Sequence, residues 1–336
     1  MDIHICVDYL CQGTRSEQKD AIESLLSVDY SKITECLIKL IEREDEQAMK
    51  EKCLLLLKVF AFPRTNMFLV ERMYKSEDPF VRNAAIDLMW QADMDFLSTM
   101  SRLSEDPDKD VRKFVIDTLI EHSSKEAVQI VTSCLNDPEK IVRQAALEAL
   151  GQIGIKSTAT FIEDQLDRET NLMIRCTCFE SLFHLGHSPN SEDIIKKYAN
   201  ETNPMIIFSF IRYLGAFGQP NDLALIEKFL IDKGDFLLQP AATSAAKIVI
   251  RYKTITLSDL FIEKIQAAIL SQKNENVIWE LSRALLFGMG DKGVEHARHM
   301  LKSDIESSRT AAQEYLSEFG TEEDQKSIQT HFDFDI

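Results

Sequence analysis

The sequence predicts an all-α protein built as a stack of about nine helical hairpins. A repeated register, a helical spacing of apolar residues within it, and turn residues at its ends support this prediction. Dipeptides of an apolar residue followed by glycine mark the register: Ile153-Gly154, Leu185-Gly186, Phe217-Gly218, Met289-Gly290 and Phe319-Gly320. The first three glycines are 32 residues apart. A fixed period in this range is typical of stacked-repeat architectures.

Residues 137–154 form the clearest unit. Their apolar side chains return every three or four residues, which is the spacing of one helix face. Asp137 and Pro138 supply a capping carboxylate and a residue that the first turn tolerates, and Gly154 predicts the helix end. A second helix is expected from Ser157 to Arg168, so each unit is a helical hairpin.

The same pattern recurs along most of the chain. The arginines after the turns are spaced 30, 31 and 32 residues apart and are Arg82, Arg112, Arg143 and Arg175. We expect residues 1–44 to be a degenerate N-terminal helical cap and residues 45–336 to be one continuous repeat domain, clearest over 76–232. Nothing in the sequence predicts a strand. The prolines in and around residues 205–255 suggest a change of curvature there.

The motif Asp-Pro-x-x-x-Val-Arg-x-Ala-Ala-x-x-Ala-Leu-x-x-Ile-Gly resembles the HEAT-like repeat of the phycobilisome-lyase type. The resemblance is strong over 76–190, recognisable to 232 and in register to 320. It implies a right-handed α-solenoid, with the first helix of each hairpin convex and the second concave. It also implies a ladder between repeats, in which Asp106, Asp137 and Glu169 accompany Arg82, Arg112, Arg143 and Arg175. This family includes scaffolds, lyase subunits and a few enzymes, so the resemblance is specific for fold rather than function.

Composition limits the functions that the chain could have. The net charge is −17, which opposes binding to a nucleic-acid backbone. The seven cysteines are scattered, which favours reduced thiols and a cytoplasmic location. No basic, apolar leader is present at the N-terminus, and no apolar run approaches the roughly 20 residues of a membrane span.

One group of residues has the right types for a metal site. Cys176 and Cys178 are followed by His184 and His187, and thiolates with imidazoles suit zinc. The repeat register places these side chains on different faces of one helix, so we expect no metal site and no cofactor there. A second pair, His296 and His299, offers only two ligands.

These observations favour a non-catalytic scaffold or adaptor that binds a partner protein or peptide on its concave helical face. The partner could be basic or a signalling protein. The second helices would supply the binding residues, which are Gln129, Ser133, Thr160, Asp164, Glu192, Lys196, Lys228 and His296. The alternative is an enzyme or enzyme subunit of the same fold, such as a tetrapyrrole or bilin lyase-like subunit. The acidic and apolar tail, His331 to Ile336, could be a docking peptide or a frayed end.

Overall fold

The computed structural model describes residues 3–43, 47–58, 67–91, 96–233, 235–252 and 256–332. Within these ranges all regular secondary structure is helical and no strand occurs, which confirms the all-α prediction. The chain divides into two compact units, Met1–Ile130 and Val131–Ile336. The predicted boundary at residue 44 lies outside the described residues, and so do residues 333–336 of the tail.

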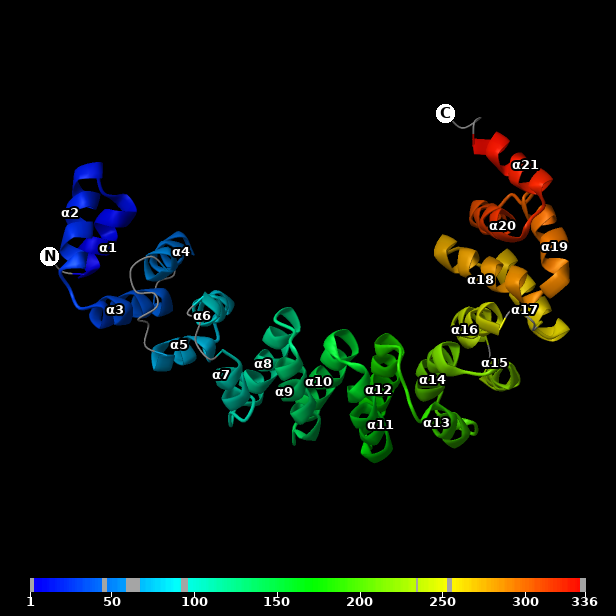
Figure 1. Ribbon diagram of the computed structural model, residues 1–336, viewed down its shortest axis with the longest axis horizontal. Helices are drawn as coiled ribbons and strands as arrows, with labels where there is room; N and C mark the ends of the chain where they lie inside the picture. The colour runs from blue at the N-terminus through cyan, green and yellow to red at the C-terminus, as the bar shows by residue number, and fades with distance from the viewer. Residues whose placement is uncertain are drawn as a thin grey trace. The chain divides into compact units, whose positions relative to one another are not determined.

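The first unit is drawn in blue to cyan in Figure 1. Its helices are α1 (Ile3–Gln12), α2 (Arg15–Leu26), α3 (Tyr30–Arg43), α4 (Gln47–Leu56), α5 (Met67–Tyr74), α6 (Pro79–Gln91), α7 (Phe96–Leu103), α8 (Lys109–Glu121) and α9 (Lys125–Ser133), which crosses into the second unit. Neighbouring helices pack in pairs, α1 with α2, α3 with α4 and α5 with α6. The hydroxyls of Tyr74 and Thr118 are hydrogen-bonded at 3.0 Å between buried side chains.

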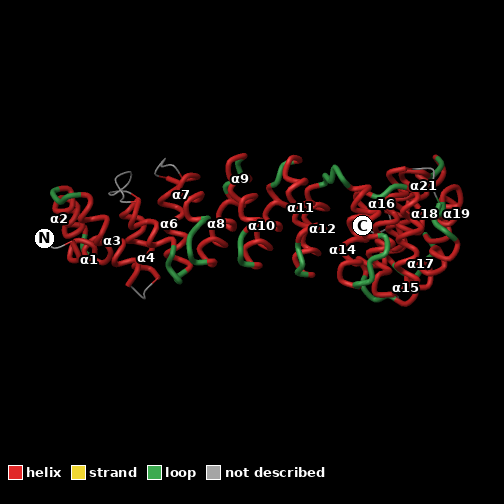
Figure 2. Tube along the Cα trace, turned by 90° about the horizontal axis from the view of Figure 1, so that it is seen from below, coloured by secondary structure: helices red, strands yellow, loops and turns green. Residues whose placement is uncertain are grey.

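The second unit repeats the pattern more regularly. Its helices are α10 (Lys140–Ile153), α11 (Ala159–Arg168), α12 (Leu172–Leu185), α13 (Ser191–Tyr198), α14 (Pro204–Phe217), α15 (Leu223–Lys233), α16 (Leu238–Tyr252), α17 (Asp259–Ser271), α18 (Glu275–Gly288), α19 (Gly293–Met300), α20 (Glu306–Phe319) and α21 (Glu322–Phe332). Short 3-10 turns precede α10, α11, α15, α16 and α19. Figure 2 shows helices joined by short loops in the described part of this unit.

The even-numbered helices of the second unit form its inner side. Each of α10, α12, α14, α16 and α18 packs closely on the next even-numbered helix, whereas α11, α13, α15, α17 and α19 have few contacts with one another. Figure 1 shows the even-numbered helices on the inside of the curve that this unit follows. Helix α11 packs on α12, α17 on α18 and α19 on α20, so a hairpin consists of an outer helix followed by an inner one.

This arrangement corrects one expectation. The resemblance implied that the helices carrying the Asp-Arg pattern are convex, but in the second unit they are the concave ones. The physical reason is that helices on the inside of a curve must approach one another more closely than those outside. The inner helices have the small residues that allow this approach.

Glycine and serine occupy the contacts between inner helices. A Cβ atom on Gly151 would lie 3.1 Å from Cα of Ser181, and one on Gly215 would lie 2.9 Å from Cα of Ser244. The Ser181 hydroxyl donates to the Leu147 carbonyl of the neighbouring helix at 2.7 Å. These residues let inner helices pack backbone against backbone, since a larger side chain would separate them.

Asparagine begins several of the inner helices. The side-chain oxygens of Asn171, Asn203 and Asn274 each accept hydrogen bonds from two backbone N–H groups of the first helical turn. Asp137 does not cap α10 in this way, contrary to expectation. Its carboxylate accepts from the N–H of Glu139 at 2.8 Å, and Glu139 is the N-cap residue. Asp137 therefore stabilises the turn that precedes the helix.

Candidate functional site

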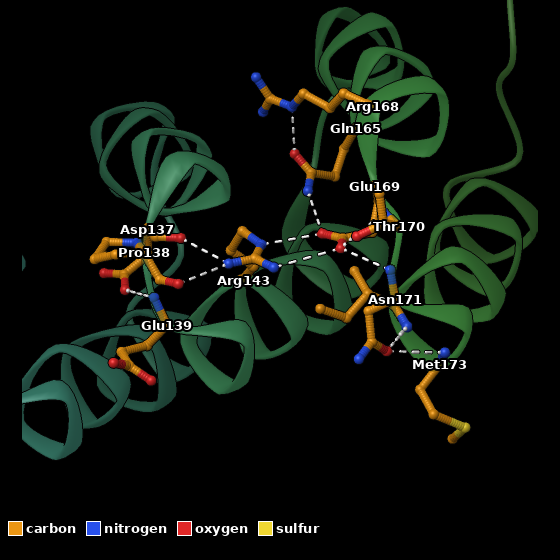
Figure 3. A network of polar contacts seen from close by, with 11 residues as sticks. Asp137, Pro138, Glu139, Arg143, Gln165, Arg168, Glu169, Thr170, Asn171 and Met173 are labelled. Atoms are coloured by element: carbon orange, nitrogen blue, oxygen red, sulfur yellow. Dashed lines mark hydrogen bonds and ion pairs between the residues drawn. The ribbon is translucent and has the colours of Figure 1, made fainter.

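Arg143 connects two successive repeats of the second unit (Figure 3). Its Nε donates to Oε2 of Glu169 at 3.0 Å, and its Nη1 donates to the carbonyls of Asp137 and Pro138 at 2.9 and 3.0 Å. The Arg143 side chain is 19% exposed and that of Glu169 only 4%. Gln165 Nε2 donates to the same carboxylate at 2.8 Å. Arg143 is thus bonded both to the turn that precedes its own helix and to the next repeat.

The environment of Glu169 favours its charged form. Burial by itself raises the pKa of the carboxyl, but hydrogen bonds from Arg143, the Asn171 N–H and Gln165, together with the Arg143 charge, outweigh burial. The pKa of Glu169 therefore lies below its ordinary value. The ion pair is a structural connection, and no reacting group is needed to explain it.

The other residues of the expected ladder make related contacts. Arg82, Arg112 and Arg309 each donate to a backbone carbonyl six residues earlier, at 2.8, 2.7 and 2.8 Å. The Asp106 carboxylate pairs with Lys75. Arg175 lies 3.8 Å from Glu201 and donates to the Tyr198 hydroxyl at 3.0 Å. The repeated element is thus an arginine that is bonded to its own turn. Arg143 and Arg175 also pair with an acidic residue, and in both cases that residue belongs to the next repeat.

The residues expected to line the concave face lie elsewhere. In the second unit they belong to outer helices: Thr160 and Asp164 to α11, Glu192 and Lys196 to α13, Lys228 to α15 and His296 to α19. Gln129 and Ser133 lie on α9. All are exposed except His296, which is half-buried. Their assignment to the concave face is wrong in the second unit, because the inner side is made by the even-numbered helices.

The inner side is hollowed over α10, α12 and α14. This first hollow has a volume of about 910 Å³ and is lined by Glu148, Gly151, Gln152, Thr177, Glu180, Ser181, His184 and Arg212. Glu180 accepts from Nη1 of Arg212 at 2.7 Å. Burial raises the pKa of Glu180, and the Arg212 charge opposes this rise. Most lining side chains are charged or polar, which suits a peptide or protein better than a small apolar molecule.

A second hollow of about 300 Å³ continues over α12, α14, α16 and α18. Its lining residues are Phe183, Phe208, Arg212, Gln239, Pro240, Thr243, Ser244, Lys247 and Glu280. The Arg212 guanidinium carbon lies 5.0 Å from the centre of the Phe183 ring, and Lys247 Nζ lies 4.4 Å from it. Both distances are within the range of cation–π interactions. Both hollows are lined by Arg212, and the two together are here named the inner groove.

Sequence reasoning missed the inner groove, although the register contains a signal for it. Phe183 and Lys247 are two periods of 32 residues apart, with Gly215 midway between them. The glycine between them adds no side chain, so the aromatic and the basic side chain can meet if the three helices are neighbours on one face. The period alone does not say which face is exposed.

The cysteines and histidines do not assemble into a site. Cys178 is buried and Cys176 is half-buried, whereas His184 is exposed at the first hollow. Burial raises the pKa of both thiols, which opposes the thiolate form that metals and electrophiles require. Within the described ranges, no three of the His, Cys, Asp and Glu side chains are arranged to hold a metal ion.

Comparison with known proteins identifies the repeat type in one part of the chain. Residues 98–183 match the family model for HEAT repeats, and the fold is an all-α solenoid. Among solved structures, importin beta is similar with a TM-score of 0.53 and 11% identity, over 93% of this chain and 51% of the importin. Kap95p, in a structure that describes its binding to RanGDP, has a TM-score of 0.52 and 12% identity, over 94% of this chain and 50% of Kap95p.

These similarities concern the fold. The chain spans about half the length of the two karyopherins that it matches. No curated protein matches the sequence. No helix within the described residues combines the length and the apolar character needed to cross a bilayer.

Proposed function

We propose that this protein is a non-catalytic scaffold that binds an extended segment of a partner protein in the inner groove of its second unit. The observation that carries the proposal is the groove itself, which runs over the inner helices α10 to α18. Its lining side chains come from successive repeats and alternate between charged, polar and aromatic groups. Such a surface offers a series of side-chain contacts along an extended chain.

The rigidity of the groove supports this use. Its helices pack closely, with Gly151 against Ser181 and Gly215 against Ser244. A preformed surface loses little conformational freedom when it binds, so more of the contact energy appears as affinity. Solved structures of similar fold include Kap95p in a study of its binding to RanGDP, which makes partner binding a reasonable expectation for this architecture.

Capture of partners from the native extract, followed by footprinting, tests the proposal. The inner variant combines Gln152→Arg and Thr177→Arg, two polar residues that line the first hollow. The matched outer variant combines Thr160→Arg and Ser271→Arg, two exposed polar residues on the outer helices α11 and α17. We expect the inner variant to lose the captured partner and the outer variant to retain it. Hydrogen exchange of the complex should show protection on α10, α12, α14 or α16.

Two results would contradict the proposal. The first is a partner that is retained by the inner variant and lost by the outer one. The second is protection confined to α11, α13 and α15. Circular dichroism and thermal melting of both variants would verify that neither change unfolds the protein.

The enzyme-subunit alternative receives no support from the thiols. Cys176 lies on α12, a helix that helps to line the inner groove, and burial raises the pKa of its thiol. A lyase that attaches a tetrapyrrole through its own cysteine would need the reactive thiolate. A coloured purified protein, or one that binds a bilin stoichiometrically, would favour this alternative.

A further inference from the structure

The second hollow brings together side chains from four consecutive inner helices, α12, α14, α16 and α18. Phe183, Gly215 and Lys247 occupy equivalent positions on α12, α14 and α16, three consecutive inner helices. Lys247 extends past α14, so its Nζ lies 4.4 Å from the centre of the Phe183 ring. A Cβ on Gly215 would lie 2.9 Å from Cα of Ser244, so this position cannot accept a side chain without moving α16.

Two cations, Arg212 and Lys247, and one carboxylate, Glu280, line this hollow. Arg212 is paired through Nη1 with Glu180 at 2.7 Å. Glu280 accepts from Gln239 and Thr243, at 3.2 and 3.0 Å. Within the described part of the chain, Lys247 forms no ion pair with a carboxylate. Burial, and then the charge of Arg212, lower the pKa of Lys247, and the charge of Glu280 opposes this only in part.

Apolar side chains are exposed beside these cations. Phe208 is 38% exposed and lines the hollow, and Met205, one turn earlier on α14, is 49% exposed. Met173, one period before Met205, is 51% exposed at the start of α12. Exposed apolar side chains therefore lie in the first turns of α12 and α14, and Phe208 brings apolar surface to the hollow itself.

We propose that the second hollow, between Arg212 and Lys247, binds the side-chain carboxylate of an acidic residue in an extended partner peptide. This inference rests on the proposed function and adds the chemistry of the ligand. The carboxylate accepts hydrogen bonds from Lys247 Nζ and from the nitrogens of Arg212 that face the hollow. An apolar residue next to it in the peptide contacts Phe208 and Met205.

Charge complementarity selects this occupant. A lysine or arginine of the partner would meet two like charges, whereas a carboxylate supplies the counter-ion that Lys247 lacks. A charge-assisted hydrogen bond is stronger than a neutral one, and the Phe183 ring shields one side from water. Inner helices lie about 10 Å apart, so a peptide that crosses α12, α14 and α16 needs roughly six extended residues.

Selection from a displayed library of random peptides about ten residues long, with the full chain as target, tests the inference. We expect enrichment of Asp or Glu beside an apolar residue. Synthetic copies of a selected peptide, measured by fluorescence anisotropy, should lose about tenfold or more in affinity when the acid becomes its amide. Lys247→Met should cause a comparable loss, and Lys247→Glu should turn the selection towards Lys or Arg.

Lys228→Met is the matched control, because Lys228 is an exposed lysine on the outer helix α15. It should leave the affinity unchanged. Selected peptides without acidic preference, or with affinity that is indifferent to Lys247, would overturn this inference. If hydrogen exchange still placed them on α12, α14 and α16, the proposed function would survive. Protection on the outer helices alone would refute both, and a library that yields no binder would count against the carboxylate site.

Discussion

Replacement of Arg143 by methionine should destabilise the second unit much more than the same replacement of Lys197. Both residues form an ion pair between successive repeats, Arg143 with Glu169 and Lys197 with Asp167. Methionine keeps most of the aliphatic stem of either side chain, so the comparison isolates the charged head and its hydrogen bonds.

The expected loss of unfolding free energy depends on how exposed each ion pair is and on which partners remain after the substitution. The Arg143 and Glu169 side chains are 19% and 4% exposed, whereas those of Lys197 and Asp167 are 51% and 60% exposed. A hydrogen bond to a charged group contributes about 1.5–3 kcal/mol, and an exposed ion pair contributes roughly 0–1 kcal/mol. Glu169 would keep Gln165 and two backbone N–H groups as donors, so it is not left alone. We therefore expect about 2–3 kcal/mol for Arg143→Met and below about 1 kcal/mol for Lys197→Met.

Urea unfolding followed by circular dichroism measures the difference. Thermal melting provides a second reading, at about 2–4 °C for each kcal/mol in a unit of this size. Arg298 is not a suitable control, since it makes two hydrogen bonds of 2.8 Å to Asp324. Equal unfolding midpoints for the Arg143 and Lys197 variants would refute the idea that the buried pair connects the repeats.

Three further changes have expected outcomes. The pKa of Glu169 is lower in the folded state than in the unfolded state. The charged Glu169 therefore stabilises the protein at pH values above its unfolded-state pKa, and this stabilisation is lost as the pH falls through its folded-state pKa. In urea melts at a series of pH values, the difference in unfolding free energy between wild type and Glu169→Gln should become smaller as the pH is lowered. Gly215→Ala should lower the melting temperature, because the added Cβ would press on Ser244. Alanine normally favours helices over glycine by about 1 kcal/mol, so the clash must outweigh this gain. A higher melting temperature would contradict the close packing of α14 and α16. Elemental analysis should find no stoichiometric zinc or iron, and one metal per chain that is lost in Cys178→Ala would show that a site exists.

Local sequence pattern predicts the helices well. The segment Ser157 to Arg168 was expected to be helical, and a 3-10 turn with α11 occupies it. Apolar spacing and end residues suffice for this because they act within one or two turns of helix. The Asp137 cap was wrong because a short polar side chain before proline can bond several nearby N–H groups, and the pattern does not choose among them.

The sidedness of the repeats could not be taken from the period. The turn at 137–139 and the turn at 154–158 are both short, so the sequence does not show which helix opens a hairpin. Curvature depends on how closely neighbouring helices approach, and this depends on contacts such as Gly215 with Ser244. The inner groove was missed for the same reason, since Phe183 and Lys247 meet only when α12, α14 and α16 are inner neighbours.

The close packing of the inner helices also has a mechanical consequence for the second unit. Helices α10 to α20 contact one another along the inner side, whereas the outer helices have few contacts with each other. When such a unit bends, the distances between outer helices change at little cost in free energy. The packed row of inner helices, here named the inner seam, keeps its length. The inner groove lies on that seam. The distances between its residues are therefore preserved while the unit bends. A bound peptide would be neither stretched nor released by this motion.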